Sequence, residues 1–400
     1  MTRHDKKRLR DALIQAVPPD DGQAEERGWQ VVREAFGDHE PSPRRFGSGI
    51  RAALAVAVAG LVAGFALTPA GADVREWIAD AIDVGEENAR PVLGSLPTEG
   101  SVLVESRDGV WVLRDDGSRR HLGGYEHATW SPNGLYVGAS RDRELFALTP
   151  QGDVRWAITA SARIRALEWS ADEGYRVAFV AGGELRVVAG DGTGEPTVVD
   201  TVASRAIAWR PESLDGIRHQ IAYVDEFDRV VLADTDSGRV LWRSEGVASE
   251  ISSLQWSEDG ERLLVELDGS AILFDAQGNS VLKGAVGTGT AITLAPAGDE
   301  VATVRADGRG QMELVIADVG IAGRERVLYP QASDAGDGAF GPPEFSPDGE
   351  WILLPWPQAD QWLFIRIADQ RVVAVADISR QLDPNLRGDP TFPRIVGWCC

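Results

Sequence analysis

The chain of 400 residues carries 62 acidic and 40 basic side chains, a formal net charge of −22 at neutral pH. Residues 73–400 hold 53 of the acidic and 30 of the basic side chains. This imbalance disfavours nucleic acid or an anionic surface as the main partner, because phosphate binding depends on clustered lysine and arginine.

The sequence of residues 1–49 predicts a cytoplasmic region with two short amphipathic helices. Lys6–Val17 places its apolar residues on one side and is followed by two prolines, which end a helix. Trp29, Val32 and Phe36 then form an apolar stripe at helical spacing. The alternative is that these segments lie on the membrane surface or have no fixed structure.

Residues 50–72 predict one transmembrane helix. Ala52–Ala72 has no charged residue over 21 positions, and about 20 apolar residues span a bilayer core. Arginines precede the segment and acidic residues follow it, so the positive-inside rule predicts a cytoplasmic N-terminus and an external C-terminal part. An open alternative is a signal peptide cleaved near Ala72, which would release a secreted domain.

Gly60 and Gly64 form a Gly-x-x-x-Gly pair within this predicted helix. Such spacing lets two transmembrane backbones approach closely, so a homodimer is a candidate state. In a segment rich in alanine and glycine the same pair also arises by chance.

The chain contains only three lysines among many arginines, alanines and glycines. This bias resembles the codon usage of a GC-rich bacterium. It would place the predicted span in the cytoplasmic membrane and the external part in the cell envelope.

Two small helices joined to a membrane span and an external domain resemble, in architecture, bacterial anti-sigma regulators. The resemblance implies a cytoplasmic protein partner for residues 1–49 and a sensor role for the external domain. Zinc-type anti-sigma domains carry a His-x-x-x-Cys-x-x-Cys cluster, whereas residues 1–49 contain no cysteine.

Residues 73–99 predict a juxtamembrane helix and a linker. Asp73 is a candidate N-cap with Glu76 three residues on, and Trp77 suits a membrane interface. Proline and glycine punctuate the stretch from Arg90 to Gly100, which is typical of a linker.

From residue 100 onward one unit recurs: an apolar strand ends in a large apolar residue and a turn follows. In the turn, proline presets φ, aspartate or asparagine bonds its own backbone, and glycine accepts a positive φ. The signature positions, which we expect to be structural, are Trp130, Pro132, Gly134, Trp169, Trp209, Trp256, Gly260, Phe345, Pro347, Asp348, Gly349 and Trp398. Leu294 occupies the same place in a weaker copy.

Successive signature residues lie 39, 40, 47, 38, 51 and 53 residues apart. These intervals bracket the ~40–50 residues of a four-stranded propeller blade. The strands in Ser101–Leu122 have no signature strand before them, while Arg394–Trp398 is a signature strand with no blade after it. We therefore predict that these two segments pair and complete a ring.

The predicted fold is all-β: a seven-bladed β-propeller over residues 100–400, preceded by the transmembrane helix and the short cytoplasmic helices. Six or eight blades are alternatives, because several copies of the signature are weak. A β-sandwich is a further alternative, but it does not need the same aromatic-turn unit at a near-constant period.

The copies at Trp130, Trp256 and Phe345 are similar to the TolB-like propeller repeat, the W-S-P-D-G family, and more loosely to tryptophan–aspartate (WD) repeat propellers. The resemblance covers residues 100–400, and the copies at Trp169, Trp209 and Leu294 depart from its pattern. It implies a platform that binds protein and no particular chemistry.

No Gly-x-Ser-x-Gly, His-Glu-x-x-His, phosphate loop or spaced Cys/His set occurs in the sequence. We therefore predict no catalytic, cofactor-binding or metal-ligating residue and no enzymatic activity, with an envelope hydrolase or lyase as the alternative. Acidic turns such as Asp234–Gly238 offer oxygen ligands for calcium, but aspartate and glycine are also what hairpin turns require.

Cys399 and Cys400 are the only cysteines in the sequence. They are candidates for a disulfide with each other, for pairing between chains, or for free thiols. Because they follow Trp398 at the predicted ring closure, a structural role is favoured. The sequence thus favours a non-catalytic, membrane-anchored propeller that binds a protein or cell-envelope ligand, with a transmembrane signalling regulator as the alternative.

Overall fold

The computed structural model of the protein describes residues 95–170, 175–211, 218–247, 249–268, 270–283, 289–307, 311–319, 324–330, 340–383 and 391–400. All of them belong to one compact unit, Glu86–Cys400. The predicted cytoplasmic region, the membrane segment with Gly60 and Gly64, and the juxtamembrane helix lie outside the described residues. Among the described residues, no helix is both long and apolar enough to cross a membrane.

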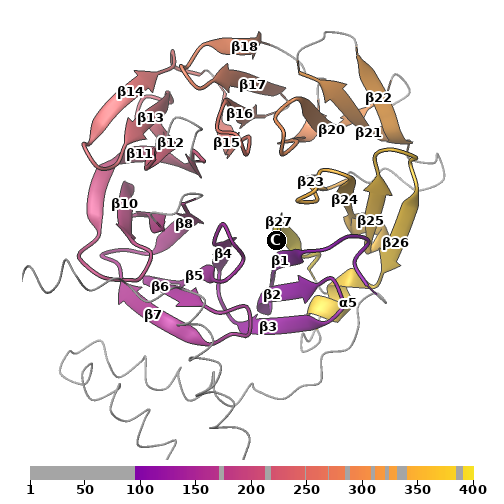
Figure 1. The fold of residues 1–400 in the computed structure, drawn as a ribbon, viewed down its shortest axis with the longest axis horizontal. Helices are drawn as coiled ribbons and strands as arrows, with labels where there is room; N and C mark the ends of the chain where they lie inside the picture. Colours follow the sequence, from indigo (N-terminus) through magenta and orange to yellow (C-terminus); the bar gives the residue numbers. More distant parts are fainter. Residues whose placement is uncertain are drawn as a thin grey trace, which may run out of the picture. The chain divides into compact units, whose positions relative to one another are not determined.

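The strands form antiparallel sheets arranged around a common centre, which is the architecture of a β-propeller (Figure 1). Within the described ranges there are five sheets of four strands and one sheet of seven strands. Within a repeat the strands run outward from the centre in chain order, except that the first sheet takes its innermost strand from the end of the chain, so the strands fall into four positions.

The innermost position is occupied by β27 (Arg394–Cys399), β4 (His127–Trp130), β8 (Ile164–Trp169), the second half of β11 (Thr197–Trp209), β15 (Ile251–Trp256), β19 (Gly289–Leu294) and β23 (Glu344–Phe345). The second position holds β1 (Ser101–Ser106), β5 (Val137–Arg141), β9 (Arg176–Ala181), β12 (Gln220–Asp225), β16 (Arg262–Leu267), β20 (Glu300–Ala306) and β24 (Trp351–Trp356).

The third position holds β2 (Gly109–Arg114), β6 (Glu144–Leu148), β10 (Glu184–Ala189), β13 (Val230–Asp234), β17 (Ser270–Asp275), β21 (Met312–Asp318) and β25 (Gln361–Arg366). The outermost position holds β3 (Arg119–Gly123), β7 (Val154–Thr159), the first half of β11, β14 (Arg239–Arg243), β18 (Ser280–Lys283), β22 (Glu325–Pro330) and β26 (Val372–Ala376).

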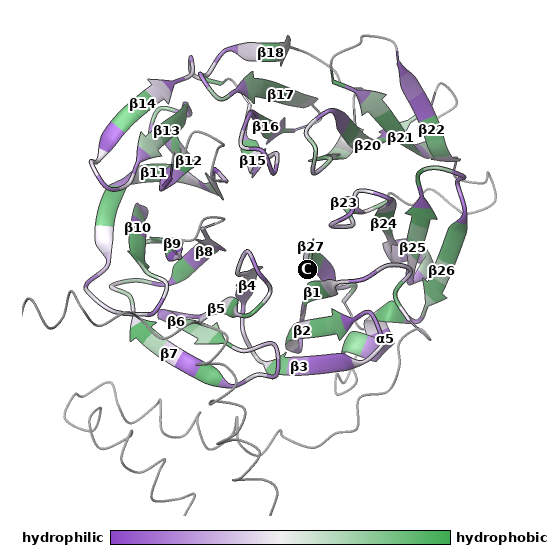
Figure 2. Cartoon of the chain, viewed as in Figure 1, coloured by the Kyte–Doolittle hydropathy of each residue, from purple (hydrophilic) through white to green (hydrophobic). Residues whose placement is uncertain are grey.

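Strands in the second and third positions are apolar along most of their length because both faces of each sheet are covered. All six residues of β12 are buried, as are five of the six in β24, whereas β14 has no buried residue. In Figure 2 the loops at the strand ends are mostly hydrophilic, while strands such as β2 and β17 are largely hydrophobic.

Most core clusters combine residues from two neighbouring sheets, and one lies between the two halves of the seven-stranded sheet. In one of them Trp351 and Leu353 of β24 pack with Val102 and Val104 of β1, so the core lies between sheets. Burial of such clusters is the main favourable term in folding, and it requires the sheets to stand side by side around the ring.

The predicted ring closure is confirmed. β27 pairs antiparallel with β1 from Ser101–Cys399 to Glu105–Arg394, with one register shift. Leu96, which precedes β1, is only 7% exposed and belongs to the same cluster as Trp398. The first sheet therefore contains strands from both ends of the described chain.

The prediction of seven separate blades differs from the sheet pattern at β11. This strand runs for 13 residues, its first half pairs with β10, and its second half pairs with β12. Thr197–Trp209 contains no glycine or proline, so nothing in its sequence forces a turn between the two halves. Two repeats consequently share one sheet of seven strands.

Two short helical turns complete the fold of the last sheet. The 3₁₀ turn η1 (Pro357–Ala359) joins β24 to β25, and α5 (Ile378–Leu382) follows β26. Ile378 and Leu382 of α5 are fully buried in the cluster between the last and first sheets, and the carbonyl of Leu382 accepts a hydrogen bond from Ser106 at 3.0 Å.

Candidate functional site

The turns after the innermost strands satisfy their own polar groups. Ser257 Oγ donates to Asp259 Oδ1 at 2.6 Å and accepts the backbone N–H of Arg262 at 3.0 Å. Ser346 makes the equivalent contacts with Asp348 and Trp351. Because these bonds stay within one turn, each turn is a rigid support at one end of the ring.

The large signature residues are buried at the ends of their strands, and the turn glycines have the positive φ that the turn chemistry predicts. Gly134, Gly260 and Gly349 have φ of +64°, +67° and +68°. Trp130 is half-buried, whereas the following are at most 8% exposed: Trp169, Trp209, Trp256, Leu294, Phe345 and Trp398.

A second contact links successive repeats at the residue just before the signature residue. Gln255 Oε1 accepts the backbone N–H of Leu294 at 2.9 Å, and its Nε2 donates to the Leu294 carbonyl at 3.3 Å. We call this contact the inter-repeat latch. It fastens the end of one innermost strand to the next signature residue.

Two glutamates occupy the same latch position. The carboxylate of Glu168 lies near the backbone N–H of Trp209 and that of Glu344 near the backbone N–H of Trp398, and each N–H lowers the pKa of the carboxylate beside it. Since glutamine serves at one latch and glutamate at two, the latch requires an oxygen acceptor and no negative charge.

A cavity of about 330 Å³ lies where five innermost strands end. We call it the central pocket. It is lined by Pro132, Gln255, Trp256, Glu258, Leu294, Pro296, Glu344, Phe345, Ser346, Pro347, Trp398, Cys399 and Cys400. These residues follow β4, β15, β19, β23 and β27 or lie at their ends, so the pocket requires the assembled ring.

The structure thus gathers only part of the signature around one site. Pro132, Trp256, Phe345, Pro347 and Trp398 line the central pocket together with the two cysteines. The other predicted positions, Trp130, Gly134, Trp169, Trp209, Gly260, Asp348 and Gly349, are not among its lining residues.

Sequence reasoning did not single out three polar residues of the pocket, Gln255, Glu258 and Glu344. Gln255 and Glu344 stand immediately before a signature residue and Glu258 stands two residues after one. Their place beside the signature was the available signal, because that place recurs in every repeat even though the residue type does not.

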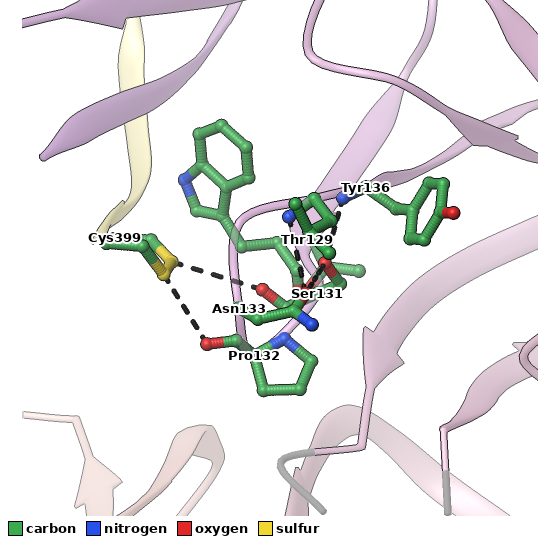
Figure 3. Close-up of a disulfide and its surroundings, with 9 residues drawn as sticks. Thr129, Ser131, Pro132, Asn133, Tyr136 and Cys399 are labelled. Carbon is green, nitrogen blue, oxygen red and sulfur yellow. Dashed lines mark hydrogen bonds between the residues drawn. A yellow bond between two sulfur atoms is a disulfide. The ribbon is translucent and has the colours of Figure 1, made fainter. Parts of the chain in front are cut away.

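The two cysteines form a disulfide with each other, and this pair forms one wall of the pocket. Cys400 Sγ lies 3.4 Å from the carbonyl oxygen of Pro132, and Cys399 Sγ lies 3.9 Å from that of Ser131 (Figure 3). The sulfur atoms of the closing strand therefore rest on the signature turn that follows β4.

Burial sets the ionisation of the carboxylates in this region. Burial raises the pKa of Glu344 to about 7, although the Trp398 N–H lowers it in part. Burial likewise raises the pKa of Glu168 to about 8, although the Trp209 N–H lowers it in part. Partial burial also raises the pKa of the exposed Glu258. The polar wall of the pocket is therefore acidic and incompletely solvated.

A second cavity, of about 340 Å³, lies beside α5 at the periphery of the last sheet. Pro357, Asp360, Asp377, Arg380 and Phe392 are among its lining residues. Its acidic and basic groups lie together, and the backbone N–H of Ser379 donates to Asp360 at 2.8 Å. This contact ties Asp360 to the first turn of α5.

Across the described ranges, no group of three or more histidine, cysteine, aspartate or glutamate side chains is arranged to hold a metal ion. In the acidic turn at Asp234, the Asp234 carboxylate accepts the N–H of Ser237 at 2.7 Å, and Asp236 contacts Arg176 and His219. The Asp234 carboxylate therefore stabilises the turn, and the Asp236 carboxylate forms an ion pair with Arg176.

No family model and no curated protein matches the chain. Among solved structures, the crystal structure of the Cps50 (Swd1) β-propeller domain of Myceliophteria thermophila is similar, with a TM-score of 0.46 and 14% identity. The alignment covers 62% of this chain and 85% of that one. The fold is defined by the sheet pattern described above: the chain contains an all-β propeller domain.

Proposed function

We propose that this propeller is a non-catalytic binding module that holds a protein or cell-envelope ligand at the central pocket. The observation that carries the proposal is the pocket itself, whose wall combines aromatic, acidic and disulfide groups from five innermost strands. Concave sites with apolar walls and a few polar groups are the usual form of ligand sites.

The module is proposed to have seven blades, with the seven-stranded sheet counted as two blades that share β11. Packing supports this count. Ala178 and Val180 of β9 belong to one core cluster with Tyr223 of β12 and Val231 of β13. The two halves of that sheet therefore face each other across a core, as neighbouring sheets do elsewhere in the ring.

The module is proposed to lie outside the cytoplasmic membrane, anchored by residues 50–72 with residues 1–49 in the cytoplasm. The charge asymmetry around the apolar segment supports this orientation. A reporter that is active only outside the cytoplasm, fused after Cys400, is expected to be active. A fusion active only inside would overturn the orientation, and a shortened chain beginning near Asp73 would instead show cleavage and secretion.

A signalling role is the second candidate, favoured by the two amphipathic stripes in residues 1–49. In this alternative the cytoplasmic region binds a transcription factor, such as a sigma factor, and the propeller acts as the sensor. Residues 1–49 should then retain a defined cytoplasmic protein in a pull-down. Retention of none would remove the signalling role and leave the binding module.

The binding module is tested by photo-cross-linking in the full-length chain. A photoreactive amino acid at Pro132 or Pro347, both on the pocket wall, should capture the same partner. The controls are Phe227 and Val281, which are 62% and 52% exposed and are absent from the pocket lining. Equal capture from all four positions would contradict a site at the pocket, and cleavage of envelope polymers by the purified chain would contradict the non-catalytic role.

A further inference from the structure

The charged side chains that line the central pocket are all acidic. Its ionisable lining side chains are Glu258 and Glu344, and no lysine, arginine or histidine lines it. In the described part of the chain neither glutamate takes part in an ion pair, although twelve other pairs form there. Glu344 is half-buried, and a partly buried carboxylate without a counter-charge is unfavourable, so the pocket favours a positively charged occupant.

Aromatic walls point to the same class of occupant. Trp256, Phe345 and Trp398 line the pocket. The guanidinium carbon of Arg210 lies 5.4 Å from the ring centroid of Trp256, so this indole already accommodates one cation. Cations bind favourably over tryptophan faces, most strongly where water is excluded.

The size of the pocket limits the ligand further. A volume of about 330 Å³ is at the lower end of the range for ligand sites, roughly 300–1,000 Å³. This space suits one side chain with its adjoining peptide group.

We propose that the central pocket receives the basic side chain, arginine or lysine, of a protein partner, with the Glu344 and Glu258 carboxylates as its counter-charges. This inference rests on the proposed binding function and names the chemistry of the ligand. The acidic character of residues 73–400 favours the approach of such a partner over longer distances.

The experiment uses the full-length chain in detergent and calorimetric titration with Nα-acetyl-arginine methylamide and Nα-acetyl-lysine methylamide. The neutral comparison is Nα-acetyl-citrulline methylamide, which has nearly the same shape as the arginine probe. We expect at least one basic probe to bind, with the citrulline probe at least about tenfold weaker. Absence of binding by both basic probes, or equal binding of citrulline, would overturn the inference.

Glu344→Gln separates the charge from the structural role. Gln255 shows that an amide oxygen can hold the latch, so this variant keeps an acceptor for the Trp398 N–H and removes only the negative charge. We expect its affinity for the basic probe to fall at least about tenfold. The matched control is Glu168→Gln, at the same latch position but outside the pocket lining, which should retain the affinity.

Glu258→Gln gives a second measurement of the affinity for the basic probe, at a residue that takes no part in a latch. Because Glu258 is exposed, we expect a smaller loss of affinity, about two- to fivefold. Unchanged affinity in both Glu344→Gln and Glu258→Gln would refute the inference. If a cross-linked partner is still captured at Pro132 in the double variant at the unchanged level, the binding module stands and only its preference for a basic side chain is refuted.

Discussion

Two junctions of the ring have the same latch but are connected differently. At the β11 junction a single strand runs from one repeat into the next, and Glu168 holds the Trp209 N–H. At the closure junction β27 meets β1 only through hydrogen bonds and packing, while Glu344 of β23, in the neighbouring sheet, lies near the Trp398 N–H. A latch alone therefore does not decide how firmly two neighbouring repeats are joined. The β11 junction is held by the continuous backbone of one strand, whereas the closure junction depends on noncovalent contacts between two strands.

The largest effect is expected from deleting Pro393–Cys400, which removes β27. The first sheet would lose its innermost strand and the pairing from Ser101–Cys399 to Glu105–Arg394. We expect a loss of more than about 5 kcal/mol, comparable to the whole stability of a domain. Urea unfolding followed by tryptophan fluorescence should show no cooperative transition at the midpoint of the full chain.

A deletion variant that unfolds at the same urea concentration as the full chain would show that the closure junction is dispensable. It would also contradict the contrast with the β11 junction.

Trp398→Ala tests the packing of the closure junction without removing the strand. Trp398 is 7% exposed and stands edge-on to Phe364, with ring centroids 5.6 Å apart. Replacing a buried tryptophan by alanine costs about 3–5 kcal/mol. The free energy of unfolding should fall by that amount, whereas Phe227→Ala, at a residue 62% exposed, should change it by less than about 0.5 kcal/mol.

Glu168→Gln tests the latch at the β11 junction through the pH dependence of the free energy of unfolding. The pKa of Glu168 is about 8 in the folded chain, above its usual 4.5, so the folded state binds the proton more tightly than the unfolded state. Its contribution to stability is therefore greatest below pH 4.5 and is lost as the pH rises to about 8. The glutamine variant should be the more stable above pH 4.5, by an amount that grows up to about pH 8.

Partial exposure of Glu168 screens its charge, so we expect a gain of about 1–3 kcal/mol at pH 8. Glu344→Gln should show the same trend ending near pH 7, because burial raises the pKa of Glu344 less. Thermal unfolding of the three proteins between pH 4 and 9 measures both curves. Parallel curves for parent and variant would contradict the raised pKa values.

The smallest effect is expected at the β11 junction itself. Two glycines inserted between Ala203 and Ser204 fall just after the change of partner from β10 to β12, in the register shift between Val202 and Ile207 of the β11–β12 pairing. Each half keeps its partner strand, so lengthening this connection should cost no more than about 1 kcal/mol. A loss as large as that of Trp398→Ala would show that the unbroken strand is itself required.

The repeat could be predicted because its turns are encoded locally. Gly260 and its counterparts adopt the positive φ that the turn sequence requires, and the unpaired strands at the two ends predicted the pairing of β27 with β1. The continuity of β11 was missed because the absence of a turn signal between Thr197 and Trp209 does not reveal where one repeat ends.

The latches and the pocket were missed for a different reason. The residue before the signature is Glu168 in one repeat, Ala208 in the next and Gln255 in the one after, so no pattern repeats there. Its partner is a backbone N–H that lies 39, 41 or 54 residues further along the chain, and a backbone group leaves no mark in the sequence. Only the assembled ring brings Glu344 beside Trp398.

The disulfide wall of the central pocket couples ligand occupancy to ring integrity. Cys399 and Cys400 reach the pocket only while β27 is paired, so the pocket exists in the closed ring and is lost when the ring opens. Any occupant consequently stabilises the closed ring relative to the open ring. At a free concentration of 100 times its Kd this stabilisation would be about 2.7 kcal/mol. The partner that the propeller recognises would in this way also prolong the lifetime of the propeller.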